Sequence, residues 1–353
     1  MLKSDKPTIK PTTMKKFLFF LAFMAIPFSA FSQETAKEKI SRGVQLHDQG
    51  KYREAIAVYE EVVAEDDKNW EAYYEMCLSY VSLNEFDNTI KYADIVIDSD
   101  SDMVPKGYYI KGVALDYSGK HKEAIKVFKK GIKEAPQFHS LYYSLAIVEC
   151  RLEEYDEAEN YLQEGLQQNP LHGSSHLLLG KLNYEERTKS LLALYNFLII
   201  EPTGKRANEA LTLIKKHHSL GVEFKDDNKV NITLNSLAVD SEFGGAEAIL
   251  SMSQALRKGE EYADKSDFEF FADNTKSFFM VLGELKENKK KKGFWWDYYV
   301  DFFYDLAKNE EMYETFMYYI HQDIQNTQVE LWLQDNPEKV DAFLDWVTNY
   351  KRA

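Results

Sequence analysis

The sequence predicts an all-α protein, in which a solenoid of stacked helix pairs precedes a helical C-terminal domain. The main observation is a segment from Ala36 to Pro202 that repeats itself about every 34 residues. A small residue recurs once per unit, at Gly43, Cys77, Gly112, Ala146 and Gly180. Two further positions recur with about the same period. One is occupied by Ala55, Thr89, Ala124 and Ala158, and the other by Pro136, Pro170 and Pro202. We expect each unit to be two antiparallel helices, which bury their apolar faces only when neighbouring units stack.

The units resemble the tetratricopeptide repeat (TPR), in which a large residue, a Leu-Gly pair, an Ala-x3-Phe motif and a Pro follow one another. The fullest match is in the fourth unit, with Tyr142-x2-Leu145-Ala146, Ala158-x3-Leu162 and Pro170. The second unit departs most, because Thr89 and Ala93 occupy the later positions. The resemblance implies a right-handed superhelical solenoid of about five TPR units over residues 33–202. It also implies a protein partner, which it does not name.

In TPR arrays the first helix of each unit lines the concave face, so the resemblance implies partner-binding positions as well. These correspond to Ile40, Val44, Tyr74, Leu78, Tyr109, Val113, Tyr143 and Ile147, with Leu177 and Lys181 in the fifth unit. All but Lys181 are apolar or aromatic, unlike the Lys and Asn of TPR proteins that clamp a C-terminal carboxylate. We expect an apolar helix or extended segment of a partner protein in this groove. The alternative is that the C-terminal domain or a neighbouring solenoid turn fills it.

The N-terminal residues 1–32 have the pattern of a signal peptide. A basic segment, Met14 to Lys16, precedes ten apolar residues from Phe17 to Ile26. A small-residue site then predicts cleavage between Ser32 and Gln33. The apolar run is shorter than the roughly 20 residues that span a bilayer, although an uncleaved anchor is the alternative. Residues 1–13, which precede this pattern, are consistent with a translation start misassigned to Met1, with Met14 as the true start. We therefore expect a periplasmic or secreted protein that is not inserted in the membrane after cleavage.

The chain is strongly acidic. It contains 58 Asp and Glu against 43 Lys and Arg, for a net charge of −15. Removal of residues 1–32 would take away five lysines and one aspartate, which makes the remainder more acidic still. Such a surface repels phosphate backbones and anionic headgroups, so we expect no nucleic-acid partner.

The two cysteines are expected to be free thiols. Cys77 occupies the small packing position of the second unit, and Cys150 lies in the first helix of the fourth. Two stacking steps of roughly 10 Å separate those helices in a regular array. A disulfide requires Cα atoms within about 7 Å.

The second half of the chain changes character after Pro202. A linking helix is expected from Arg206 to His218, and residues 203–241 form a connector in which Val230 to Leu234 alternates as a short strand or extended segment would. Helical periodicity then predicts a C-terminal domain over residues 242–353. Its last helix is expected to begin at Pro337.

An aromatic run from Phe294 to Tyr304 is the densest of the sequence. Its rings fall all round a helix, and Asp297, Asp301 and Asp305 recur at a spacing of four. We interpret the run as a central core helix with the three carboxylates facing solvent. The alternative is a sugar or metal site made of carboxylates and rings. Nearby, Lys289 to Lys292 favours a solvated loop over a docking patch for an acidic partner.

The sequence contains no His-Glu-x-x-His or paired-Cys metal motif and no Gly-x-Ser-x-Gly nucleophile elbow. It also contains no glycine-rich loop that could bind phosphate. His172 and His176 are four residues apart, but the small residues between them favour a helix start over a metal site. We expect no catalytic residue, no metal and no cofactor. The prediction is a non-catalytic interaction scaffold or adaptor of the bacterial cell envelope. The alternative is an envelope enzyme with its active site in the aromatic-rich C-terminal domain, for which the array recruits a substrate or partner.

Overall fold

The computed structural model describes residues 34–226, 229–233, 242–322 and 326–352. The chain divides into two compact units, Met1–Glu85 and Phe86–Ala353, each of which is described by itself. The predicted all-α class is confirmed: the described residues form helices, apart from one two-stranded hairpin. The predicted signal peptide and its cleavage point, Ser32-Gln33, lie outside the described residues. In the described part of the chain, no helix combines the length and apolar character needed to cross a membrane.

The first unit contains helices α1 (Ala36–Asp48), α2 (Tyr52–Glu65) and α3 (Trp70–Ser82). The repeating small residue has the expected role here. A Cβ atom added to Gly43 would lie 2.3 Å from Cε1 of Tyr59, so only glycine lets α1 approach α2 this closely. Gly50, in the turn between these helices, has a φ of +77°, which favours glycine.

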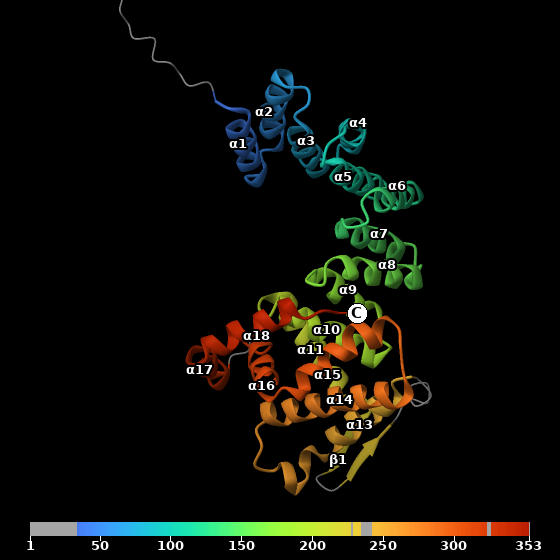
Figure 1. Ribbon diagram of the computed structural model, residues 1–353, viewed down its shortest axis with the longest axis vertical. Helices are drawn as coiled ribbons and strands as arrows, with labels where there is room; N and C mark the ends of the chain where they lie inside the picture. Colours follow the sequence, from blue (N-terminus) through green and yellow to red (C-terminus); the bar gives the residue numbers. More distant parts are fainter. Residues whose placement is uncertain (1–33, 227–228, 234–241, 323–325, 353) are drawn as a thin grey trace, which may run out of the picture. The chain divides into compact units, whose positions relative to one another are not determined.

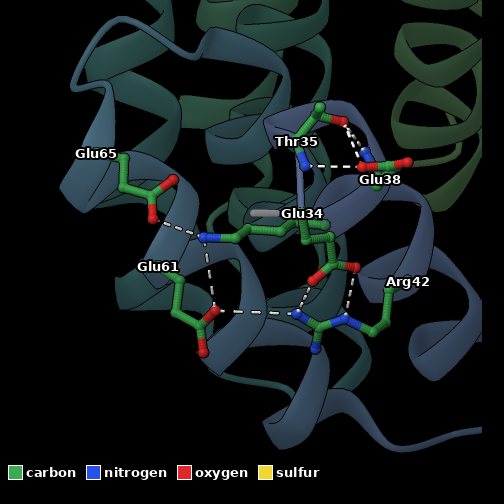
Figure 2. A network of polar contacts seen from close by, with 7 residues as sticks. Glu34, Thr35, Glu38, Arg42, Glu61 and Glu65 are labelled. Atoms are coloured by element: carbon green, nitrogen blue, oxygen red, sulfur yellow. Dashed lines mark hydrogen bonds and ion pairs between the residues drawn. The ribbon is translucent and has the colours of Figure 1, made fainter. Parts of the chain in front are cut away.

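Charged side chains add to the α1–α2 contact (Figure 2). A capping box between Thr35 and Glu38 begins α1. Lys39 is only 8% exposed, and its Nζ atom lies 2.6 Å from Glu65 on α2. Arg42 pairs with Glu34 at 2.9 Å. The predicted helix hairpin is therefore stabilised by apolar packing and by ion pairs at its rim.

The second compact unit, Phe86–Ala353, contains further helix pairs. These helices are α4 (Phe86–Ile97), α5 (Val104–Tyr117), α6 (His121–Glu134), α7 (His139–Arg151), α8 (Tyr155–Gln168), α9 (Gly173–Leu182) and α10 (Arg187–Ile200). Gly112 repeats the close approach of Gly43, because a Cβ there would lie 2.3 Å from Cε1 of Phe128. Gly119, between α5 and α6, has a φ of +79°.

Helix α10 is unlike the other repeat helices because it is buried on all sides. Every residue from Leu191 to Ile199 is buried. Its apolar residues belong to one core cluster with Phe278, Phe302 and Phe343 of the C-terminal helices. The predicted division at residues 203–241 stays a prediction, since helices from both sides of that connector share this core.

The described residues after α10 form further helices and one hairpin, and α11 packs directly against α10 (Figure 1). The elements are α11 (Lys205–Ser219), β1 (Val222–Asp226), β2 (Lys229–Ile232), α13 (Gly244–Ala255), the 3-10 turns η1 (Leu256–Lys258) and η2 (Glu260–Tyr262), α14 (Asp267–Lys289), the π-helical turn η3 (Trp295–Val300), α15 (Asp301–Lys308), α16 (Glu310–Tyr319), α17 (Thr327–Asp335) and α18 (Pro337–Asn349). Strands β1 and β2 pair antiparallel, with Val222 opposite Ile232. Of the two possibilities for Val230 and its neighbours, the strand is observed.

The aromatic run forms η3 and α15, and its predicted role as a core helix is confirmed. Trp296, Tyr299 and Phe302 are each at most 1% exposed. Its three carboxylates remain partly exposed, with 34% of the Asp297 side chain, 40% of Asp301 and 47% of Asp305 accessible to solvent. Two of them also form ion pairs, since Nζ of Lys286 on α14 lies 2.7 Å from Asp297 and 2.6 Å from Asp301.

Candidate functional site: a cavity on α5 and α7

A cavity of about 300 Å³ lies on the first helices of the third and fourth repeats. Its lining includes Tyr109 and Val113 of α5 and Tyr143 and Ile147 of α7. These are the four partner-binding positions that the sequence placed in these two repeats. All four side chains are half-buried, so each retains surface that a ligand can contact.

Helical spacing explains why these residues meet. Tyr109, Val113 and Tyr117 lie four residues apart and therefore share one face of α5. Tyr143, Ile147 and Arg151 form the equivalent stripe of α7, and both stripes line the cavity. Tyr117 was not among the predicted positions, although its spacing from Val113 is the signal that identifies it. It is 55% exposed, which is the largest exposure of any large hydrophobic side chain in the described residues.

The charges in the cavity are paired with each other. Asp116 is 6% exposed, and its carboxylate lies 2.8 Å from Nδ1 of His121 and 3.4 Å from Nε of Arg151. His172 packs its ring against Tyr143 at 5.0 Å. Burial lowers the pKa of His172 to about 4, so its ring is neutral at pH 7. The surface of the cavity is therefore mostly aromatic, aliphatic and neutral.

The remaining predicted positions are distributed differently. In the first unit, Ile40 is 7% exposed and belongs to the core, whereas Val44, Tyr74 and Leu78 are half-buried on α1 and α3. In the fifth repeat, Leu177 is 7% exposed and belongs to the core cluster that contains the C-terminal helices.

The C-terminal helices also bind polar groups of the fifth repeat. Nδ1 of His176 lies 2.6 Å from the hydroxyl of Tyr299, and its Nε2 atom lies 2.9 Å from the carbonyl oxygen of Pro170. The Tyr298 hydroxyl donates to the carbonyl oxygen of Leu166. These contacts use both ring nitrogens of His176, which makes it a structural residue. Across the described ranges, no three His, Cys, Asp or Glu residues are placed to hold a metal ion.

Stacked helix pairs with a lined cavity on their first helices define a helical-repeat protein. Residues 117–182 match the sequence profile of a family described as "Tetratricopeptide repeat". Residues 117–182 therefore contain tetratricopeptide repeats. Such repeats are protein–protein interaction modules.

Named relatives share parts of this region. "Tetratricopeptide repeat protein 28" of Homo sapiens is 30% identical over 115 residues, which is 33% of this chain and 4% of that protein. "BBSome complex member BBS4" of Bos taurus is 24% identical over 133 residues, 38% of this chain and 25% of that protein. "Hsp70-Hsp90 organizing protein" of Triticum aestivum is 26% identical over 111 residues, 31% of this chain and 19% of that protein. The chain thus matches only a small part of each relative's length.

Two solved structures each match 52% of this chain. A thermophilic TPR protein of Thermus thermophilus has 20% sequence identity and a TM-score of 0.41, over 52% of this chain and 98% of that one. PilW, described as a widely conserved type IV pilus biogenesis factor, has 16% identity and a TM-score of 0.43, over 52% of this chain and 90% of that one.

Proposed function

We propose that this protein is a non-catalytic interaction scaffold that binds an apolar segment of a partner protein in the cavity of α5 and α7. The observation that carries the proposal is the convergence of two stripes of half-buried or exposed side chains on one cavity. Tyrosines give large contact areas at a low cost in side-chain entropy, which suits them to anchor a bound chain. A helix whose apolar face follows the stripes is the partner that best fits this shape.

The electrostatics support an apolar partner segment. Asp116 and Arg151 pair with each other, so the cavity offers no unpaired buried charge for a ligand to neutralise. Polar groups on the lining, such as Ser140 and Ser144, provide hydrogen bonds to the partner backbone. Outside the cavity, the acidic chain favours basic residues on the partner segment.

The proposal includes an extracytoplasmic location, which rests on the signal-peptide pattern of residues 1–32. Mass spectrometry of the protein isolated from its native envelope is expected to find Gln33 at the N-terminus. An intact Met1 or Met14 in the exported protein would contradict this part of the proposal.

Partner capture can be tested by introducing negative charges into the cavity. The double variant Val113→Asp and Ile147→Asp buries two carboxylates under any apolar ligand, which we expect to weaken capture at least tenfold. Both side chains are half-buried, so the melting temperature should change little. The matched control is Leu152→Asp with Leu171→Asp, at exposed apolar positions outside the cavity. Lost capture in the cavity variant alone supports the proposal. A large fall in its melting temperature would show that the cavity is internal core.

Photocrosslinking locates the contact directly. A photoreactive phenylalanine analogue at Tyr117, in the cavity, is compared with the same analogue at Tyr155, which is similarly exposed but lies outside it. We expect the same crosslinked partner in repeated native extracts from the Tyr117 position only. Equal products from both positions would contradict a specific groove.

The enzyme alternative has one observation in its favour. A second cavity lies among the C-terminal helices, and two of its lining residues, His218 and His321, have pKa values lowered by burial. Perturbed histidines in a cavity are a feature of active sites as well as of binding sites. A turnover assay with candidate substrates separates the two, because only an enzyme converts a substrate, and a His321→Asn variant should then lose that turnover.

A further inference from the structure

The second cavity has a volume of about 370 Å³ and is lined by residues of α11, α13, η1 and α14, together with His321 and Asn326. Three phenylalanines form its apolar wall, Phe268, Phe270 and Phe271. The ring of His218 packs against Phe271 at 4.5 Å, and the ring of His321 packs against Phe268 and Phe271, at 5.3 Å from each. A flat apolar ligand can contact these rings over a large area.

A chain of hydrogen bonds determines which nitrogen of His218 carries the proton. The Thr275 hydroxyl lies 2.8 Å from the carbonyl oxygen of Phe271, which can only accept, so threonine donates there. The Tyr195 hydroxyl lies 3.0 Å from Oγ1 of Thr275 and must then donate to it. Nε2 of His218, 2.7 Å from the Tyr195 oxygen, must in turn donate to tyrosine. Nδ1 of His218 is therefore the nitrogen with the free lone pair.

This lone pair is unused by the protein. His218 is 2% exposed, and its Nδ1 atom has no hydrogen-bond partner among the described residues. Burial, together with the nearby Arg187 charge, lowers the pKa of His218 well below its usual range. The ring is thus a neutral acceptor without a donor, which is costly in a buried position.

His321 presents a second acceptor. Its Nδ1 atom lies 2.8 Å from the carbonyl oxygen of Met317 and therefore donates to it. The lone pair is left on Nε2, for which the described part of the chain shows no partner. Burial lowers the pKa of His321 to about 4, so this ring is also neutral at pH 7. Nδ1 of His218 is itself inaccessible, so His321 is the acceptor that a ligand with a hydrogen-bond donor would use.

The cavity also carries a positive charge in an acidic chain. Arg257 is occupied by Asp267 at 2.7 Å and stacks on Phe270 at 5.1 Å. Lys215 lines the same cavity and forms no ion pair within the described ranges. Partial burial lowers the pKa of Lys215, although the Asp267 charge opposes this effect. An anionic group on the ligand would neutralise this ammonium, whereas a cationic ligand would be repelled.

We propose that this cavity binds a small aromatic hydroxy acid. The ring of the ligand lies among the phenylalanines, its hydroxyl donates to the lone pair on Nε2 of His321, and its carboxylate pairs with Lys215. The site is separate from the cavity of α5 and α7, and this proposal does not depend on the scaffold function.

Calorimetry with three probes tests each contact. The probe 4-hydroxyphenylacetate carries the ring, the hydroxyl and the carboxylate, phenylacetate lacks the hydroxyl, and 2-(4-hydroxyphenyl)ethanol lacks the carboxylate. We expect the first to bind the full chain most tightly, and each deletion to weaken binding about tenfold. The same affinity for all three probes, or no binding of the first at millimolar concentration, would overturn the proposal.

A matched pair of variants tests the lysine. Lys215→Met removes the charge that lines the cavity, and Lys216→Met removes the next charge along α11, which does not line it. Both side chains are exposed, so both variants should fold. We expect Lys215→Met alone to weaken 4-hydroxyphenylacetate about tenfold and to leave the binding of the alcohol probe unchanged. Equal losses in the two variants would overturn the role of Lys215.

Histidine nitrogen NMR tests the hydroxyl contact. An unprotonated imidazole nitrogen changes its ¹⁵N shift when it accepts a hydrogen bond. We expect 4-hydroxyphenylacetate to shift the Nε2 resonance of His321, and phenylacetate to leave it unchanged. If Zn²⁺ alone shifts this resonance while the acid probe is silent, the cavity is a metal site and the proposal is wrong.

Discussion

At the scale of single residues, the repeat depends on positions where no side chain fits. Gly43 and Gly112 each face an aromatic ring of the partner helix, and an added Cβ would lie within 2.3 Å of a ring carbon. Such an overlap cannot relax without moving a helix, because Tyr59 and Phe128 are completely buried. Other repeats have Cys77 and Ala146 at the equivalent position. Whether a side chain fits there therefore depends on whether an aromatic ring lies opposite.

Gly112→Ala is expected to lower the free energy of unfolding by about 1–3 kcal/mol, because the methyl group overpacks against Phe128. The control is Gly245→Ala, also in a helix, where the nearest side-chain atom would lie 3.3 Å from the new Cβ. That change should be nearly neutral. Urea denaturation measures both, and equal effects would contradict the steric explanation.

The cysteines give a second prediction at this scale. Both are free, as predicted, and Cys77 is completely buried while Cys150 is half-buried. Burial raises the pKa of both thiols, and more so for Cys77. Thiol titration should therefore detect Cys150 slowly in the native protein and Cys77 only after denaturation. A count near zero under denaturing, non-reducing conditions would contradict the free-thiol assignment.

At the scale of elements, the aromatic run, which forms η3 and α15, packs against α14. Gly283 of α14 makes this contact possible, since a Cβ there would lie 2.1 Å from ring atoms of Tyr304. Lys286, one turn further on, binds two carboxylates of the run. The hydrogen bond from Lys286 offsets the effect of burial and lowers the pKa of Asp297.

Lys286→Met is expected to lower the free energy of unfolding by about 1–3 kcal/mol, because Asp297 and Asp301 lose a shared charge-assisted hydrogen bond. Lys289→Met is the matched control on the same helix, at an exposed position. Chemical denaturation at low and high salt checks the result. A loss of the same size in the control would show that the helix end, and not the carboxylate pair, is responsible.

At the scale of the whole molecule, burial of histidines makes folding sensitive to acid. Burial lowers the pKa of His217 and His321 to about 4 and that of His176 to about 3. The unfolded chain binds protons at these rings near pH 6.5, and the folded chain does not. Their contribution to stability is therefore complete above pH 6.5 and is lost progressively as the pH falls toward 4.

We expect the free energy of unfolding to fall between pH 6.5 and pH 4, by on the order of 2 kcal/mol per buried histidine. His321→Asn cannot take up this proton, so the variant should lose less stability over this range than the parent protein. Denaturation series at constant ionic strength measure the two slopes. Identical slopes would show that other groups control the acid response.

The sequence by itself determined the architecture of the first half of the chain and which residues meet there. The period of about 34 residues, the small residues and the apolar stripes are local patterns, and helix pairs stack on their immediate neighbours. For this reason Tyr109, Val113, Tyr143 and Ile147 could be assigned to one surface, and the structure places them around one cavity. Tyr117 was missed although it extends the same stripe.

Only the tertiary structure decided the features that depend on distant contacts. Burial of α10 by the C-terminal helices, the pairing of Lys286 with two aspartates and the covering of Leu177 all join residues more than one repeat or element apart. The cavity with His218 and His321 belongs to the same class, because helices far apart in the sequence enclose it. Periodicity records which face of a helix is apolar, but it contains no information on which distant element covers that face.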